Sequence, residues 1–227
     1  MVQIKESLKR RYLINKKLQN TSKLSSKRVK TQNIGARVAN THDMILRIAL
    51  KLFNAQGSRT ITTNHIAKEC AISPGNLYYH YKNKEEIIRA LYDQMVREWD
   101  EHIATFTVFD MSVFVKVIEH SNVIFRRYRF IHNELYVLCQ NDPALDEINR
   151  KRLQIKKTTV QTMIELLIEH EGFEPLDKKT LEFLVDAVLM FAIFWLPYQE
   201  MISLNVTQNA SLDGIKVLIE HFLNKRC

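Results

Sequence analysis

Residues 62–87 read TTNHIAKECAISPGNLYYHYKNKEEI, and local signals in this stretch predict three helices in close succession. A threonine hydroxyl, from Thr62 or Thr63, can accept a hydrogen bond from the free backbone N–H groups at the start of the first helix. The apolar residues that follow recur at the spacing of one buried helix face, and they are Ile66, Ala67 and Cys70. This first helix is predicted to end near Ala71.

A second helix is predicted from about Pro74 to Tyr81. Ser73 supplies an oxygen for the unpaired N–H groups, and proline suits the first helical position because no N–H is needed there. Asn83 and Glu86 form a capping pair that opens the third helix. The apolar residues on the buried side of that helix are Ile87, Ile88 and Leu91. The pattern is that of a helix-turn-helix.

The exposed side chains of the second helix suit contact with double-stranded DNA. Gly75 has no side chain to keep the helix away from another surface, and the Asn76 amide can pair with adenine. Hydroxyl and imidazole donors suited to phosphate oxygens follow, namely Tyr78, Tyr79 and His80. The alternative is an ordinary solvated turn with Leu77, Tyr78 and Tyr81 in the core, and we accept a core position for Leu77 and Tyr81.

Two kinds of DNA contact are predicted. Contacts to phosphates would fix the register of the protein on the duplex, and they are assigned to Thr62, Tyr78, Tyr79, His80 and Lys84. Base edges are predicted to face Thr63, Gly75 and Asn76, and Ser73 at the helix start completes the DNA-binding set. Specificity then depends on few residues.

Positions 41–91 resemble the N-terminal DNA-binding domain of TetR/AcrR-family transcriptional regulators. The residues that carry the resemblance are Ala49, Leu52-Phe53, Gly57, Ile66-Ala67, Leu77-Tyr78-Tyr79-His80-Tyr81 and Lys82-Asn83-Lys84. Two positions depart from the family pattern. Tyr81 replaces the usual Phe, and Ala71 replaces a turn glycine, so the Ala71 backbone either avoids a positive φ or bears slight strain.

Charge and the lack of an apolar face mark a basic flexible tail at 1–40. The resemblance implies a helix-turn-helix domain at 41–91 and an effector-binding and dimerisation domain at 92–227. It also implies a homodimer, in which the last two long helices of each chain form a four-helix bundle. Two recognition helices roughly 34–36 Å apart would enter successive major grooves of a near-palindromic operator. An effector bound behind the third helix would change that separation and weaken the operator complex.

Net positive charge is confined to the tail and the helix-turn-helix. Residues 1–40 hold 11 Lys and Arg against one acidic residue, residues 41–84 hold six against two, and residues 85–227 hold 16 against 22. The first two segments therefore attract a polyanion, and the last repels one. We expect the tail to add phosphate contacts, and the alternative is an unselected solvated extension.

The chain is predicted to be all-α. Its 227 residues contain only five Gly and four Pro, and long segments show helical periodicity without runs of alternating β-branched residues. The basic tail lacks the apolar core of a secretory signal. The longest apolar run, 187–196, is ten residues, and a membrane helix needs about 20. We therefore expect a cytoplasmic protein with no membrane contact.

Neither the cysteines nor the histidines are spaced as metal ligands. Cys70, Cys139 and Cys227 are far apart and none belongs to a CxxC motif, which fits a reducing compartment. Cys70 and Cys139 are predicted to fill helix-core positions rather than to sense redox state. The eight histidines include no HxxxH pair. No metal and no other cofactor is predicted.

Further helices are predicted beyond Leu91. The third helix continues to about Thr105, and the others are expected at 112–127 with Ser112 as its cap, 131–140, 143–171, 178–196 and 211–225. Asp142-Pro143 opens the longest of them and Gly172 ends it. The helix at 178–196 is apolar on almost every side, so it is predicted to lie in a core or a subunit interface.

Aromatic residues gather between positions 99 and 136 together with a few polar groups, a mixture that can line an apolar pocket. The predicted effector-binding residues are Trp99, Phe125, Tyr128 and His132. The alternative, that these are ordinary core residues beside solvated arginines, stays open.

These observations favour a homodimeric transcriptional repressor that a small apolar or amphipathic ligand releases from its operator. An architectural DNA-binding factor without an effector would share the same N-terminal half. An enzyme on a helical scaffold is disfavoured, because the sequence shows no paired-carboxylate motif, phosphate loop, nucleophile elbow or metal set, and no catalytic residue is assigned.

Overall fold

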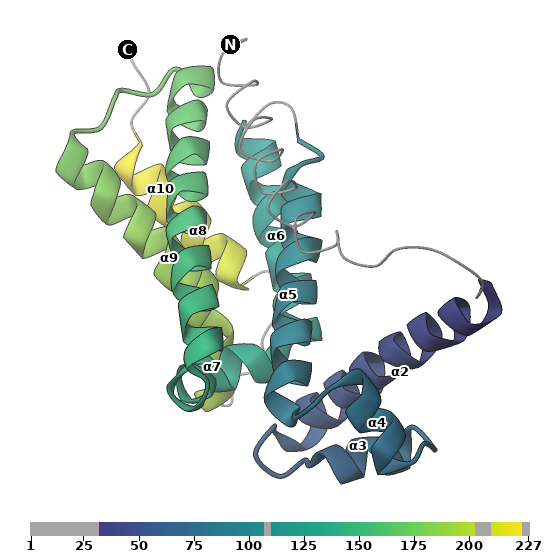
Figure 1. The fold of residues 1–227 in the computed structure, drawn as a ribbon. Coiled ribbons are helices and arrows are strands. Elements are labelled where there is room, and N and C mark those ends of the chain that lie inside the picture. The colour runs from purple at the N-terminus through teal and green to yellow at the C-terminus, as the bar shows by residue number, and fades with distance from the viewer. Residues whose placement is uncertain (1–31, 107–109, 203–209, 224–227) are drawn as a thin grey trace. The chain divides into compact units, whose positions relative to one another are not determined.

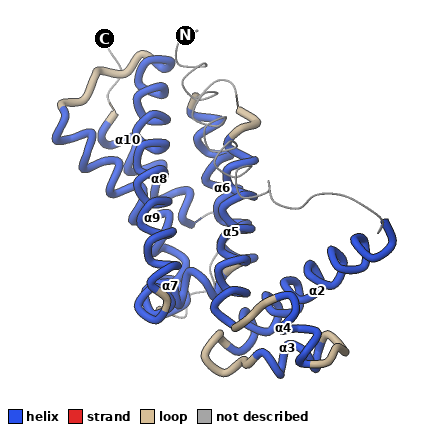
Figure 2. Tube along the Cα trace, viewed as in Figure 1, coloured by secondary structure: helices blue, strands red, loops and turns tan. Residues whose placement is uncertain are grey.

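The computed structural model describes residues 32–106, 110–202 and 210–223, which form helices α2 to α10 joined by loops (Figures 1 and 2). The all-α prediction is confirmed. The chain separates into two compact units, residues 1–43 and 44–227. In the first unit residues 32–43 are helical, and His42 Nδ1 lies 3.5 Å from a carboxylate oxygen of Asp43. The contacts described below belong to the second unit.

Helix α2 spans Gln32–Gln56 and begins within the segment that the sequence assigned to a flexible tail. Residues 32–40, which the sequence placed in the basic tail, are therefore helical. The remainder of the predicted tail, residues 1–31, lies outside the described residues.

The helix-turn-helix domain consists of α2, α3 (Thr63–Glu69) and α4 (Pro74–His80). Its core contains fully buried side chains from all three helices, including Ile45, Phe53, Ile66 and Leu77. Burial of one such side chain contributes roughly 1.5–3 kcal/mol. Because isolated helices shorter than about 12–15 residues are marginal in water, packing rather than local propensity holds α3 and α4 together.

Side-chain caps determine where these short helices begin. Thr62 Oγ1 accepts a hydrogen bond from His65 N at 3.3 Å, and the His65 ring accepts one from Thr62 N in return. Ser73 Oγ accepts from Asn76 N at 3.1 Å at the start of α4. Asn83 caps α5 in the same way. The three predicted helix starts are confirmed.

The turn between α3 and α4 contains a residue in a strained conformation. Ala71 has a φ of +53°. Its N–H donates to Lys68 O, and Ile72 N donates to Ala67 O, each at 3.0 Å. This pair of hydrogen bonds is the one that ends a helix around a left-handed residue, where glycine is usual because a Cβ is crowded. Of the two alternatives for Ala71, the structure shows a positive φ and its strain.

Helices α5 to α10 complete the second unit. Their bounds are α5 (Lys84–Ile103), α6 (Met111–Arg127), α7 (Arg129–Asn141), α8 (Pro143–Glu171), α9 (Lys178–Met201) and α10 (Ala210–Phe222). Helix α5 leaves the helix-turn-helix and lies beside α6, while α9 packs between α8 and α10 (Figure 1). In the described ranges, no helix combines the length and apolar character needed to cross a membrane.

Some helix ends differ from the predicted ones. The cap of α6 is Asp110, whose carboxylate accepts from a first-turn N–H at 2.8 Å, and not Ser112. Helix α9 continues through Pro197, because a proline close to a helix end removes only one backbone hydrogen bond. Asp142 and Gly172 bound α8 as predicted.

One apolar core joins the helix-turn-helix to the helices that follow. It includes Ile87 and Leu91 on α5, and Tyr128 and Ile131 at the corner between α6 and α7, all fully buried. Cys70 is buried in this core and Cys139 packs against it, as predicted, while Cys227 lies outside the described residues. Burial raises the pKa of the Cys70 thiol, which favours its unreactive protonated form.

Ala71→Gly is expected to stabilise the protein. The substitution removes the cost of holding a residue with a Cβ in the left-handed conformation, roughly 1–2 kcal/mol. It also makes the unfolded chain more flexible, which lowers stability by about 0.4–1 kcal/mol. The free energy of unfolding, measured by urea denaturation, should therefore rise by up to about 1 kcal/mol. Ala67→Gly, at a right-handed position inside α3, is the control and should destabilise. A lower urea midpoint for Ala71→Gly would show that the turn is not strained.

Candidate DNA-binding surface and apolar pocket

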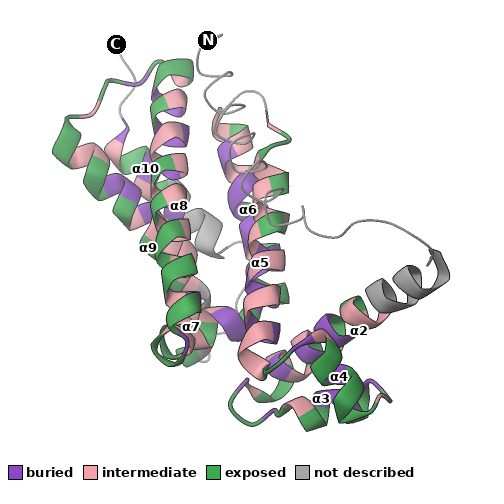
Figure 3. Cartoon of the chain, in the orientation of Figure 1, coloured by how far each residue is buried: buried purple, intermediate pink, exposed green. Residues whose placement is uncertain are grey.

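Helix α4 presents its polar side to solvent and its apolar side to the core (Figure 3). Leu77 and Tyr81 have exposed fractions of 0% and 5%, whereas Tyr79 is 77% exposed. Gly75 and Asn76 also lie on the exposed side. The core positions predicted for Leu77 and Tyr81 are confirmed. The side chains assigned to DNA lie outside the core.

Hydroxyl groups connect α3 and α4 at this surface. Tyr78 OH and Thr63 Oγ1 lie 3.1 Å apart and share a hydrogen bond. The Thr62 hydroxyl oxygen accepts from the backbone when it caps α3, so its hydrogen can still donate to a phosphate. The Tyr79 ring stands edge-on to His80, with ring centres 5.3 Å apart. Donors from both helices are therefore presented together.

Gly75 is not required by the fold itself. Its backbone is not left-handed, and a Cβ added there would meet only Ser73 Oγ, at an ordinary contact distance of 4.0 Å. Neither backbone conformation nor internal packing explains the absence of a side chain. What the glycine provides is an open helix start that an outside surface can approach closely.

Two lysines stand at the start of α5. Lys84 Nζ donates to Ser58 O at 2.8 Å, which ties α5 to the loop after α2. An ammonium has three donors, so this internal bond leaves others for a phosphate. Lys82 is exposed just after α4 and forms no ion pair within the described part of the chain. Lys82 lies outside the predicted DNA-binding set, although it belongs to the Lys82-Asn83-Lys84 run.

The corner between α6 and α7 holds the end of α2 and the loop that follows it. Asn54 Nδ2 donates to Arg127 O at 2.7 Å, and Asn54 Oδ1 accepts from Phe130 N at 3.1 Å. The Glu134 carboxylate accepts from Ser58 N at 3.0 Å and from the Ser58 hydroxyl. Hydrogen bonds to a charged acceptor are stronger than neutral ones, so α7 is firmly attached to the DNA-binding domain.

Two further contacts attach α5 to the start of α8. Arg89 Nη1 lies 2.6 Å from Asp142 Oδ2, and Tyr92 OH donates to Asn149 Oδ1 at 2.9 Å. The Arg89 and Asp142 side chains are only 26% and 10% exposed, so removing either partner would leave a poorly solvated charge. The start of α5 therefore moves together with the helices around it.

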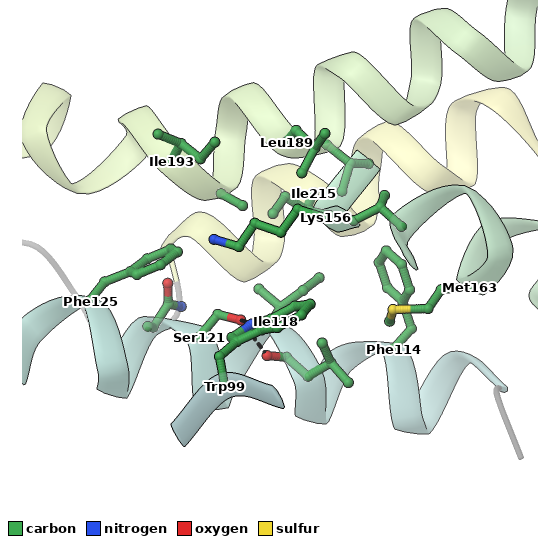
Figure 4. A pocket seen from close by; sticks show the side chains of 15 residues that line it. Trp99, Phe114, Ile118, Ser121, Phe125, Lys156, Met163, Leu189, Ile193 and Ile215 are labelled. Atoms are coloured by element: carbon green, nitrogen blue, oxygen red, sulfur yellow. Dashed lines mark hydrogen bonds between the residues drawn. The ribbon is translucent and has the colours of Figure 1, made fainter. Parts of the chain in front are cut away.

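A small apolar cavity lies between α5, α6, α8, α9 and α10 (Figure 4). Its volume is about 50 Å³, which leaves room for a few water molecules. Trp99 and Phe125, two of the predicted effector residues, line it. So do Phe114, Met163 and the stem of Lys156. The rest of the lining is mainly aliphatic.

The other two predicted effector residues lie outside the lining. Tyr128 is fully buried at the α6–α7 corner and donates to Glu98 Oε1 at 2.6 Å; its burial and this carboxylate raise the pKa of Tyr128. Burial lowers the pKa of His132 to about 3, so its ring is neutral, and the ring packs 4.1 Å from that of Phe125. Tyr128 belongs to the core shared by the two domains, and His132 adjoins the pocket wall.

Lys156 is the polar group of the pocket that the sequence did not reveal. Its Nζ lies 5.5 Å from the ring centre of Trp99 and 5.5 Å from that of Phe125. Burial lowers the pKa of Lys156 to about 8, an effect that the charge of Asp100 only partly opposes. In the sequence Lys156 stands beside Lys157 among the charged residues of α8. The sequence pattern does not distinguish a lysine that points inward from one that points to solvent.

Two family models match the chain. The model for bacterial regulatory proteins of the tetR family matches residues 45–91, and the TetR model for bacterial transcriptional repressors matches residues 85–224. The first match covers most of the helix-turn-helix domain. The second covers more than half of the chain, including the helices around the pocket.

Individual relatives agree with these models. The transcriptional regulator UidR of Escherichia coli strain K12 is 41% identical over 51 residues; the match covers 22% of this chain and only 26% of UidR. A TetR-family regulator from Marinobacter aquaeolei VT8 superposes with a TM-score of 0.75 at 26% identity, over 81% of this chain and 91% of that one. A putative regulator from Saccharomonospora viridis, solved in complex with choline, has a TM-score of 0.68 at 16% identity, over 83% and 100%.

The matches extend the resemblance seen at positions 41–91 to the helices of the second domain. They set aside the enzyme alternative, because the relatives are transcriptional regulators. The chain belongs to the TetR family of DNA-binding transcriptional regulators.

Proposed function

We propose that this chain acts as a homodimeric repressor, which a small apolar or amphipathic ligand releases from its operator. The observation that carries the proposal is the continuity of one core from the exposed helix α4 to a second domain with an apolar cavity. A DNA-reading element and a ligand site that share packed helices can bias each other's conformation.

Helix α4 is the element proposed to enter the major groove. Gly75 and Asn76, at its exposed start, would face base edges, while Tyr79 would hold a phosphate. Thr63 and Tyr78 are already hydrogen-bonded to each other, so their contact geometry is set before DNA is bound. Pre-set side chains lose less conformational freedom on binding than mobile ones.

Helix α9 supports the proposed dimer, because its own chain leaves apolar side chains uncovered. Phe183, Met190 and Phe194 are 58%, 61% and 61% exposed and recur at helical spacing on one face. Val217 on α10 is 64% exposed. Exposed apolar patches mark interaction sites. A twofold mate that packs the same two helices against these would cover them and present two α4 helices to one operator.

The cavity supports release by a ligand. Trp99 Nε1 donates to Ser121 Oγ at 3.0 Å, which links α5 to α6 at the cavity wall. A ligand larger than a few water molecules requires helices around the cavity to separate. Because α5 also carries Ile87 and Leu91 in the core beneath α3 and α4, a displaced α5 would move the recognition helix. The operator complex would weaken by the ligand's differential affinity for the two states.

Asn76→Ala and Tyr79→Ala should separate base readout from phosphate binding. Asn76→Ala is expected to weaken operator binding by about 1–3 kcal/mol and to leave binding to a scrambled duplex nearly unchanged. Tyr79→Ala should weaken both by a similar factor, since a phosphate contact carries no sequence information. Fluorescence anisotropy on both duplexes measures this. Equal losses on the two duplexes for Asn76→Ala would contradict its base contact.

Gly75→Ala should change stability and DNA binding in different directions. Alanine is the better helix residue, so the free energy of unfolding should stay equal or rise by up to about 1 kcal/mol. The added methyl should keep DNA away from the helix start and lower operator affinity. Gly172→Ala, at the left-handed end of α8, is the control and should lower stability with little effect on affinity. Unchanged operator affinity for Gly75→Ala would refute close approach at this point.

Phe194→Glu tests the proposed dimer surface. A charge in the middle of the α9 patch should give monomers and abolish operator binding, because one half-site provides little affinity. Tyr136→Glu is the control, since Tyr136 is 76% exposed and lies on α7 rather than on α9 or α10. Light scattering after size exclusion reports the mass of each variant. A Phe194→Glu protein that stays dimeric and binds its operator would place the interface elsewhere.

A further inference from the structure

The cavity has one polar end and one apolar end (Figure 4). The ammonium of Lys156 points toward Phe125, while Phe114 and Met163 stand at the opposite end. The walls between them are supplied by aliphatic side chains of α9 and α10. Such a site matches a ligand with a polar head and an apolar chain.

The polar end carries a positive charge that lacks a counter-ion. In the described part of the protein, Lys156 has no ion pair or hydrogen bond; its ammonium lies 5.5 Å from the ring centres of Trp99 and Phe125, and the charge of Asp100 acts on it from beyond ion-pair distance. The nearby carboxylate of Asp100 is held by Arg152 at 3.1 Å. A cation among apolar groups without a partner is costly, and ring faces compensate only part of that cost.

A second polar side chain without a partner adjoins the same end. Both ring nitrogens of His132 are buried, and neither has a hydrogen-bond partner among the described residues. Its ring packs on Phe125 at 4.1 Å between ring centres. A neutral imidazole keeps one N–H donor. At this end of the cavity, the ammonium of Lys156 has no ion-pair partner and the N–H of His132 has no acceptor among the described residues. An anionic oxygen would serve both groups.

We propose that the effector is an amphipathic monocarboxylate, whose carboxylate pairs with Lys156 near Phe125 and whose apolar chain extends toward Phe114 and Met163. This inference rests on the proposed function and narrows its ligand class. The site also disfavours ligands with a cationic head group, because Lys156 would repel them. Since the cavity holds only a few water molecules, the chain enters by separating α6 from α8 and α9.

The pH dependence of binding follows from the surroundings of Lys156. Of the charged groups around it, Asp100 on α5 is paired with Arg152, and His132 on α7 is neutral because burial lowers its pKa to about 3. The lining residues from α6, α9 and α10 are not titratable. Burial lowers the pKa of Lys156 to about 8 in the unliganded protein. Above that pH, carboxylate binding must take up a proton.

Three probes of equal chain length test the head group: octanoate, octan-1-ol and octylamine, titrated calorimetrically into the full-length protein at pH 7. Octanoate should bind at least tenfold more tightly than octanol, and octylamine should bind most weakly. Above about pH 8 the affinity for octanoate should fall by up to tenfold per pH unit, because each binding event takes up one proton. Octanol binding should not depend on pH.

Lys156→Met keeps an apolar stem of similar length and removes the charge. This variant should bind octanoate at least tenfold more weakly than the wild type, keep its affinity for octanol and lose the pH dependence. Lys151→Met is the matched control, because Lys151 lies on the same helix, is 70% exposed and pairs with Glu147. It should bind all three probes like the wild type. Thermal melts of both variants check that the fold is retained.

The possible outcomes separate a failure of the carboxylate assignment from a failure of the proposed effector site. Equal affinity for octanoate and octanol, or unchanged octanoate binding by Lys156→Met, would refute the anionic head group and leave an apolar effector site in place. Tight binding of octylamine would refute it as well. If none of the three probes binds, both the carboxylate assignment and the use of this cavity as an effector site are overturned.

Discussion

The rest of the structure depends on the junction between the two domains, where Tyr128 donates a hydrogen bond to Glu98. Tyr128 is fully buried at the α6–α7 corner, and Glu98 stands on α5, the helix that continues from the DNA-binding domain into the second domain. Around this bond the apolar cores of both domains merge. Interiors are close-packed and shift between discrete arrangements rather than deforming gradually. Under the proposed function, a change at the cavity would therefore be passed to α3 and α4 as a movement of whole helices.

Beside that core, hydrogen bonds hold the loop after α2 to both α5 and α7. Glu134 on α7 binds Ser58 in the loop after α2, and Lys84 at the start of α5 binds the carbonyl of the same residue. Ser58 is buried, with 2% exposure, so these bonds are shielded from competing water. One loop residue thus connects the first helix of the DNA-binding domain to both α5 and α7. The recognition helix itself stays short and exposed, and it takes its orientation from these neighbours.

The small volume of the cavity and the ammonium of Lys156 would both link ligand binding to a movement of helices. A preformed large pocket would accept a ligand without any change in the helices around it, and such binding would not alter the DNA-binding domain. Here the cavity has a volume of only about 50 Å³, and Lys156 lies beside two aromatic rings without an ion pair among the described residues. Under the proposed function, ligand binding and helix displacement would then be one event. The free energy of pairing the partly buried ammonium would help to drive it.

The sequence by itself determined the all-α class, the helix-turn-helix and most helix starts, because these depend on groups a few residues apart. The caps at Thr62, Ser73 and Asn83, and the buried Leu77, are of this kind. Only the tertiary structure decided which residues of the second domain meet. It placed Trp99 and Phe125 in the cavity, moved Tyr128 into the shared core, and turned Lys156 inward. A helical pattern gives the face on which a residue lies, but the neighbour of that face is set by packing between segments far apart in the chain.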